Sequence, residues 1–225
     1  MNSKDDGGHV PFEVTESEFF NEEALQGVFE INRSLIQLLV AAAGRPASES
    51  RPQVVLALGP TFLELSAGAR ECLAHCPVAL VDVEFRNAEW WRQIECAQGG
   101  SAARPASLGC FPRLQAIQLA QATLTIAWSL VRSSREAATV IFGLTPECAA
   151  RLAGLAAPAI QRLAETQAPY VRPRWDTDAI FWRELLRIAQ AADSPTQPRL
   201  PPMGIYVLQR QFADLVPLAP RACNS

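Results

Sequence analysis

The feature that most constrains this chain is an internal repeat, because the same order of parts occurs twice along its 225 residues. Each copy begins with a long apolar helical stretch, VFEINRSLIQLLVAAA at 28–43 and LQAIQLAQATLTIAWSLV at 114–131. A loop, short helices of small residues, an extended segment and a final helix follow in both copies. Segments 65–85 and 155–175 have the same length, which sets the two copies in register.

The repeat predicts a mainly α fold built from two tandem helical modules that pack against each other as a pseudo-dimer. In each module we expect a long helix, a short helix pair and a short extended segment, of which PVALVDVEF (77–85) is the best strand candidate. Trp90 and Trp91 of the first copy correspond to Phe181 and Trp182 of the second. The expected boundaries are a disordered acidic arm at 1–18, copy 1 at 19–97, a linker at 98–112, copy 2 at 113–190 and a Pro-rich C-terminal tail at 191–225.

Each long helix carries an apolar stripe at helical spacing. An exposed stripe of this kind would be an aggregation liability, so we expect the two helices to cover each other within one chain. We interpret the tryptophan in the second stripe as a core or interface residue rather than as a ligand contact. The predicted inter-repeat interface is formed by Leu35, Ile36, Leu39, Leu124, Trp128 and Val131.

The stretch GLTPECAARLAGLAAPAIQRLAET, which begins at residue 143, predicts two short helices. Thr145 can cap a helix that begins at Pro146, Gly154 suits its end, and Pro158 suits the first turn of the next helix. Two helices joined by such a turn have the dimensions of a helix-turn-helix, a common DNA-reading unit. A plain αα-hairpin within a helical core is the alternative.

Charge argues against strong DNA binding by this chain alone. The net charge is −3, and residues 1–100 carry 7 basic and 15 acidic side chains, whereas residues 113–190 carry 9 arginines and 6 acids. Affinity for DNA comes largely from cations that neutralise phosphates, so only the second copy offers material for a contact. The DNA-contact candidates are Arg172, Arg174, Arg183 and Arg187; for the last two, a solvated helix face near Glu184 is the alternative.

Catalytic and metal chemistry find little support in the residues. The chain has two histidines, His9 and His75, and no glycine-rich loop of the kind that holds phosphates. Cys72, His75 and Cys76 could begin a metal site, but no second ligand pair has suitable spacing. We therefore expect no enzyme, no catalytic residue, no metal and no cofactor. No apolar run reaches the roughly 18 residues of a membrane span, and no signal peptide is visible, so we expect a cytoplasmic protein.

The second copy resembles the FlhD family of flagellar transcriptional activator subunits. The parts that carry the resemblance are LTIAWSLV, SREAATVIFG, LAGLAAPAIQRLAET and RPRWD, between about Ala120 and Gln190. RLAETQ (162–167) is the most specific stretch, and RWD (174–176) occupies the place of the family's RFD motif. The first copy matches more weakly, through EIN and VEFR, and the whole chain resembles a tandem duplicated FlhD-like protein.

The resemblance implies a helical fold that pairs through its long helix and joins an FlhC-type partner to activate transcription. Val81 and Val171 stand where the family often has a cysteine, so a disulfide-linked dimer is not supported. The expected function is that of a non-enzymatic regulatory subunit that reaches DNA through an FlhC-like or other regulatory protein partner, with further oligomerisation left open. The alternative is a helical adaptor or assembly protein of a secretion apparatus, which the acidic surface and the tail segment LPPMGIYVLQRQF (200–212) would suit equally well.

Overall fold

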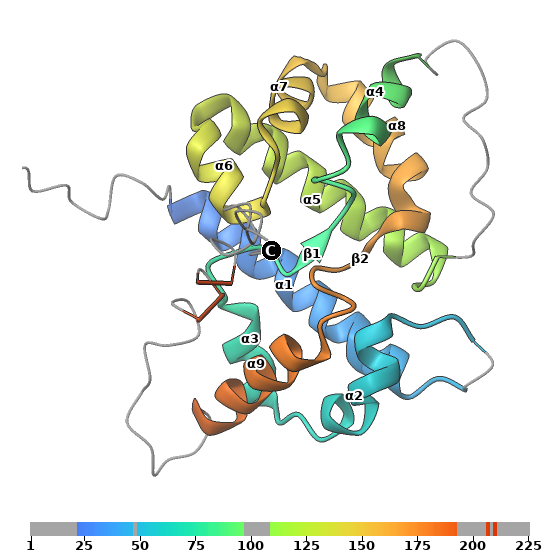
Figure 1. Ribbon diagram of the computed structural model, residues 1–225, viewed down its shortest axis with the longest axis vertical. Helices are drawn as coiled ribbons and strands as arrows, with labels where there is room; N and C mark the ends of the chain where they lie inside the picture. Colours follow the sequence, from blue (N-terminus) through green and yellow to red (C-terminus); the bar gives the residue numbers. More distant parts are fainter. Residues whose placement is uncertain (1–21, 47–48, 97–108, 193–205, 208, 211–225) are drawn as a thin grey trace, which may run out of the picture.

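The computed structural model describes residues 22–46, 49–96, 109–192, 206–207 and 209–210 (Figure 1). These residues form a mainly α fold, as expected, with one two-stranded sheet in the described part of the chain. The predicted disordered arm at 1–18 lies outside the described residues. The elements are α1 (Glu22–Ala43), α2 (Gln53–Leu63), α3 (Ala67–Ala74), β1 (Val81–Asp82), α4 (Ala88–Cys96), α5 (Arg113–Ser133), α6 (Arg135–Phe142), α7 (Pro146–Gly154), α8 (Ala157–Gln167), the 3-10 turn η3 (Ala168–Tyr170), β2 (Arg172–Pro173) and α9 (Ala179–Ala192).

Local sequence signals explain where the short helices begin. The Thr145 hydroxyl oxygen accepts a hydrogen bond from the Cys148 amide at 3.2 Å, and α7 begins at Pro146 as predicted. Gly154 is the last residue of α7, and α8 follows with Pro158 in its first turn. Side-chain caps of this kind satisfy amide groups that have no partner inside the helix.

The long helices α1 and α5 pack against each other, as the apolar stripes predict. Gly27 lies at a point of close approach, because a Cβ atom there would come within 2.4 Å of the Ile126 Cδ1 atom. Five of the six predicted interface residues are almost fully buried, with exposed fractions of 4% or less: Leu35, Ile36, Leu39, Leu124 and Val131.

Trp128 departs from that prediction. Its side chain is only partly buried, and its indole Nε1 donates a hydrogen bond to the Leu155 carbonyl oxygen at 2.9 Å. Leu155 lies between α7 and α8. The hydrogen bond of the Trp128 indole is therefore made within the second copy and not with the first. The Arg132 guanidinium lies 4.8 Å from the ring centre. The described contacts therefore give Trp128 a role in holding the α7–α8 turn onto α5.

The final helix of each copy packs on the opposite copy (Figure 1). Helix α9 lies against α2 and α3, and the Phe62 and Trp182 ring centres are 6.1 Å apart. Helix α4 lies against α7, and the Trp90 ring meets the Tyr170 ring at 5.9 Å. The buried residues consequently form one continuous apolar core through both halves of the chain.

The predicted strand at 77–85 forms regular pairing over only two residues. Val81 is opposite Pro173, and Asp82 is opposite Arg172, in an antiparallel pair. The rest of the segment is irregular because its backbone groups bond elsewhere. For example, the Ala79 amide donates to the Ile141 carbonyl oxygen at 2.9 Å.

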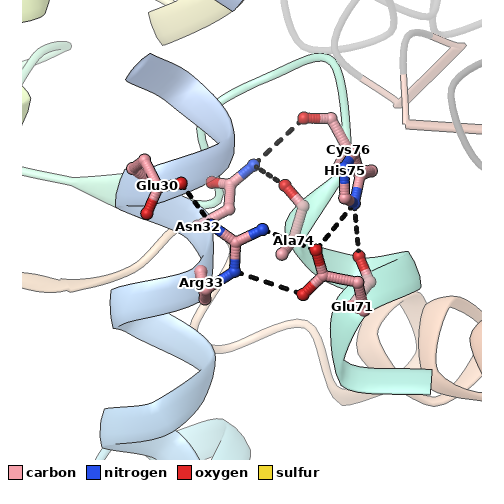
Figure 2. Close-up of polar contacts among 7 residues, drawn as sticks. All are labelled: Glu30, Asn32, Arg33, Glu71, Ala74, His75 and Cys76. Atoms are coloured by element: carbon pink, nitrogen blue, oxygen red, sulfur yellow. Dashed lines mark hydrogen bonds and ion pairs between the residues drawn. The ribbon is translucent and has the colours of Figure 1, made fainter. Parts of the chain in front are cut away.

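A buried amide in α1 holds the segment that leads into β1 (Figure 2). The Asn32 Nδ2 atom donates to the Cys76 carbonyl oxygen at 3.0 Å, as Figure 2 shows. It also donates to the Val78 carbonyl oxygen at 2.9 Å. Its Oδ1 atom accepts from the Leu80 amide at 2.8 Å. Next to it, Arg33 bridges Glu30 and Glu71, and so ties α1 to α3 at the surface. The position of β1 is therefore set by side chains of the first long helix.

Among the described residues, one helix, α5, is long and apolar enough to cross a membrane by length and composition. Core helices of soluble proteins pass the same test. Here α5 packs against α1, α6, α7 and α8, which accounts for its apolar composition.

Candidate functional site

A hollow of about 510 Å³ lies beside the β1–β2 pair and is the candidate functional site. Residues from both copies line it, because α2 begins there, α6 ends there, and β1 and β2 each contribute residues. Its volume is within the range of small-ligand pockets. The lining residues are Gln53, Asp82, Arg86, Phe142, Arg172, Pro173, Arg174, Trp175, Asp176 and Thr177.

Asp176 connects the hollow to the start of α2. Its Oδ1 atom accepts a hydrogen bond from the Val54 amide at 3.0 Å, so an acidic side chain of the second copy caps a helix of the first. Burial raises the pKa of Asp176, although hydrogen bonds from the Val54 and Gln53 amides and the charge of Arg172 act in the opposite direction. The ionised carboxylate is thus held at the site at a cost in desolvation.

Arg172 lies at the rim with its charge already paired. Its Nη2 atom is 3.1 Å from the Asp82 Oδ2 atom and 2.9 Å from the Glu84 Oε1 atom. Burial lowers the pKa of Arg172, but these two carboxylates outweigh that effect and the pKa is raised overall. As a DNA-contact candidate, Arg172 would have to give up these carboxylates to bind a phosphate.

The position of Arg174 in the structure differs from the predicted DNA contact. Only 6% of the residue is exposed, its amide donates to the Leu80 carbonyl oxygen at 2.6 Å, and its Nη1 atom donates to the Ile141 carbonyl oxygen at 3.3 Å. The guanidinium also stacks over the Trp175 ring, 4.5 Å from its centre. A cation at the last turn of α6 is favoured by the helix dipole. Arg174 therefore caps α6 inside the protein, and the prediction that it contacts DNA is wrong.

Two residues near the hollow adopt backbone angles that favour glycine. Glu84 has φ of 63° and Trp175 has φ of 56°. Each is held by its neighbours: the Glu84 carbonyl oxygen accepts from the Trp91 indole at 2.9 Å, and the Trp175 ring packs on Phe181 with 4.6 Å between ring centres. Strained residues of this kind often mark functional sites.

The other two predicted DNA contacts lie on the outer face of α9 and do not line the hollow. Arg183 is exposed, whereas Arg187 forms an ion pair with Glu184. On α8, the second helix of the predicted helix-turn-helix, the exposed charges are Arg162 and Glu165, which cancel. Of the four candidates, Arg172, Arg183 and Arg187 are thus exposed, and of these three only Arg183 has no ion pair among the described residues.

Cysteine and histidine do not assemble into a reactive centre in the described part of the chain. No group of three His, Cys, Asp or Glu side chains that could hold a metal is found among the described residues. The His75 Nδ1 atom is 2.8 Å from the Glu71 carbonyl oxygen, and burial raises the pKa of Cys76 to about 12. A thiol with such a pKa is a poor nucleophile at neutral pH.

The hollow is lined by two carboxylates, three arginines and a small number of apolar side chains. The described residues that line it include no histidine, cysteine, serine or lysine. Sequence reasoning selected Arg172 and Arg174 but missed Asp82, Asp176 and Arg86 as their neighbours. Asp82 could have been found as the first of two acids inside the apolar segment 77–85, and Asp176 as the last residue of the RWD motif.

Known proteins offer no direct guide to this site. The chain matches no protein-family model, no curated protein and no solved structure.

Proposed function

We propose that the chain is a non-enzymatic regulatory subunit of a transcription activator complex of the FlhD/FlhC type, formed by a tandem duplication and paired internally as a pseudo-dimer. It acts in the cytoplasm through a regulatory protein partner and contacts DNA weakly at most. The sequence resemblance motivates this function, and the arrangement of the two copies supports it.

The observation that carries the proposal is the register of β1 and β2. Segments 65–85 and 155–175 correspond in length, so Asp82 corresponds to Arg172, and these two residues lie directly opposite each other. Corresponding residues of two antiparallel strands meet in this way when a twofold axis passes between them. A pair of family modules that has become one chain would be expected to keep such an axis.

Repeated local contacts support a duplication. The Trp91 indole donates to the Glu84 carbonyl oxygen, and the corresponding Trp182 indole donates to the Arg174 carbonyl oxygen, both at 2.9 Å. The helix that follows is capped in the first copy by Asn87, whose Oδ1 atom accepts from the Trp90 amide at 3.1 Å. In the second copy, Asp178 accepts from the Phe181 amide at 2.9 Å. The same construction, in two segments of unlike sequence, points to a common origin.

The surface favours a protein partner over direct DNA binding. None of the eleven residues of α2 is charged, yet Leu56 and Leu63 on this helix are 58% and 52% exposed. Exposed apolar surface is typical of protein–protein contacts. Three of the four candidate arginines, in contrast, are engaged by the protein's own groups: Arg172, Arg174 and Arg187.

The test is co-expression with an FlhC-type partner, followed by purification and a DNA-shift assay with the complex and with each subunit. We expect the complex to shift promoter DNA specifically and the isolated chain to bind weakly and without sequence preference. Leu56→Asp and Leu63→Asp should reduce recovery of the partner, whereas Leu114→Asp, at a 68% exposed position on α5, serves as the matched control. Specific nanomolar DNA binding by the chain alone, or a complex that never binds DNA, would contradict the proposal; the second result favours a secretion adaptor.

A further inference from the structure

The C-terminal tail contributes a short helical segment that docks on the start of α9. Residues 206, 207, 209 and 210 are helical, and Val207 is fully buried. The Tyr206 ring stacks on Phe181, with ring centres 5.4 Å apart and planes within 7°. The contact was not anticipated from the sequence, which predicts only a Pro-rich tail there.

An ion pair also holds the docked segment on α9. The Arg210 Nη2 atom is 2.9 Å from the Asp178 Oδ2 atom, and the Asp178 Oδ1 atom accepts from the Phe181 amide. One carboxylate therefore caps α9 and holds the tail. Burial raises the pKa of Tyr206, and the nearby charges of Glu184 and Asp178 act in the same direction, whereas the charge of Arg210 acts in the opposite direction.

The docked segment is also connected to the hollow through Phe181. Phe181 is 2% exposed and contacts the Trp175 ring as well as Tyr206. Trp175 lines the hollow and has a positive φ. Phe181 thus lies between the docked tail and a strained residue of the candidate site.

We propose that the surface formed by Asp178 and Phe181 is a binding site for a short helix with an aromatic residue, a valine next to it and an arginine three residues after the valine. The chain's own Tyr206, Val207 and Arg210 occupy this site and mask it. A partner segment of the same chemistry binds there when it displaces the tail. This inference is independent of the proposed transcriptional function, because it rests on the docked segment alone.

The strength of the masking follows from the tether. Thirteen residues, 193–205, connect α9 to Tyr206, and tethers of this length typically give an effective concentration of about 1 mM. If the same segment binds as a free peptide with a Kd of about 100 μM, the tail weakens that binding about tenfold in the intact chain.

The experiment measures fluorescence anisotropy of a labelled peptide that spans residues 203–213, titrated with the full-length chain. The parent chain is compared with Val207→Asp, which places a charge in the buried position, and with Arg210→Glu, which repels Asp178. Arg210 is half-buried, whereas Val207 is fully buried, so this second variant tests the same idea with a smaller change to the core. A Tyr206→Ala peptide is the control for the aromatic contact.

We expect both variants to bind the peptide about tenfold more tightly than the parent chain, and the Tyr206→Ala peptide to bind much more weakly than the parent peptide. Equal affinity of parent and variant chains, or equal affinity of the two peptides, would overturn the proposal. Circular dichroism spectra of the variants show whether the helical fold is kept. An Arg210→Glu chain that keeps the fold and binds no peptide would also overturn it.

Discussion

Replacing Gly143 by alanine tests the buried position of Arg174 directly. Gly143 ends α6 in the left-handed conformation, with φ of 69°, and a Cβ atom there would lie 1.8 Å from the Arg174 Nη2 atom. The substitution has two separate effects. An alanine is strained at this φ, and the guanidinium must move away from the Ile141 carbonyl oxygen and the Trp175 ring.

The size of the effect can be worked out from these parts. The left-handed conformation costs about 1–2 kcal/mol for alanine. Loss of a hydrogen bond from a charged group costs about 1.5–3 kcal/mol, and loss of the cation–π contact about 0.5–1 kcal/mol. We therefore expect Gly143→Ala to lower the free energy of unfolding by about 3–6 kcal/mol, which is large for a single methyl group.

The assay is urea unfolding followed by circular dichroism, in a double-mutant cycle with Arg174→Met. In the Arg174→Met background, Gly143→Ala should cost only the backbone part, about 1–2 kcal/mol. Gly154→Ala is the matched control, since a Cβ atom there meets nothing within 4 Å, and it should leave stability unchanged or increase it. The reasoning is refuted if Gly143→Ala unfolds like the parent, or if it costs as much without the guanidinium as with it.

Three further predictions concern buried polar groups. Because burial raises the pKa of Asp176, its carboxyl favours folding only when protonated and loses this contribution as pH rises through the folded-state pKa. Asp176→Asn should therefore gain stability relative to the parent between pH 3 and pH 7 in parallel thermal melts; a constant difference contradicts this. Gln167 is fully buried, and its side-chain amide has no hydrogen-bond partner among the described residues. Gln167→Met should be neutral or stabilising by up to about 1–3 kcal/mol in urea unfolding, and a clear loss would reveal an unseen partner. Trp128→Phe removes the bond to Leu155 and should cost about 0.5–1.5 kcal/mol in the same assay. Trp182→Phe, at a fully buried position, should cost more.

Local chemistry was enough to predict the long helices and the α7–α8 pair, but not α6 as a separate helix. Thr145 and Pro146 define the start of α7 within four residues of sequence, and the apolar stripes of the long helices mark the faces that are buried. These signals are readable because a cap bonds to its own helix and a stripe repeats with the helical period. The same periodicity does not say which neighbour a face will meet. For this reason Leu124 is buried as the stripe predicts, whereas the bond from Trp128 to the Leu155 carbonyl oxygen is not readable from the stripe.

Only the tertiary structure decided the chemistry of the candidate site. Asp176 caps a helix 122 residues before it, and Arg174 is buried by groups from Leu80 and Ile141, which are far from it in sequence. The sequence alone does not distinguish an arginine that is exposed to water from one that binds a helix carbonyl oxygen. The difference lies in whether the fold brings acceptors within about 3 Å of the guanidinium, and this depends on packing between distant segments. The sequence by itself thus determined the long helices and their buried faces, while packing between distant segments, such as those of Leu80, Ile141 and Arg174, fixed which charges remain at the surface.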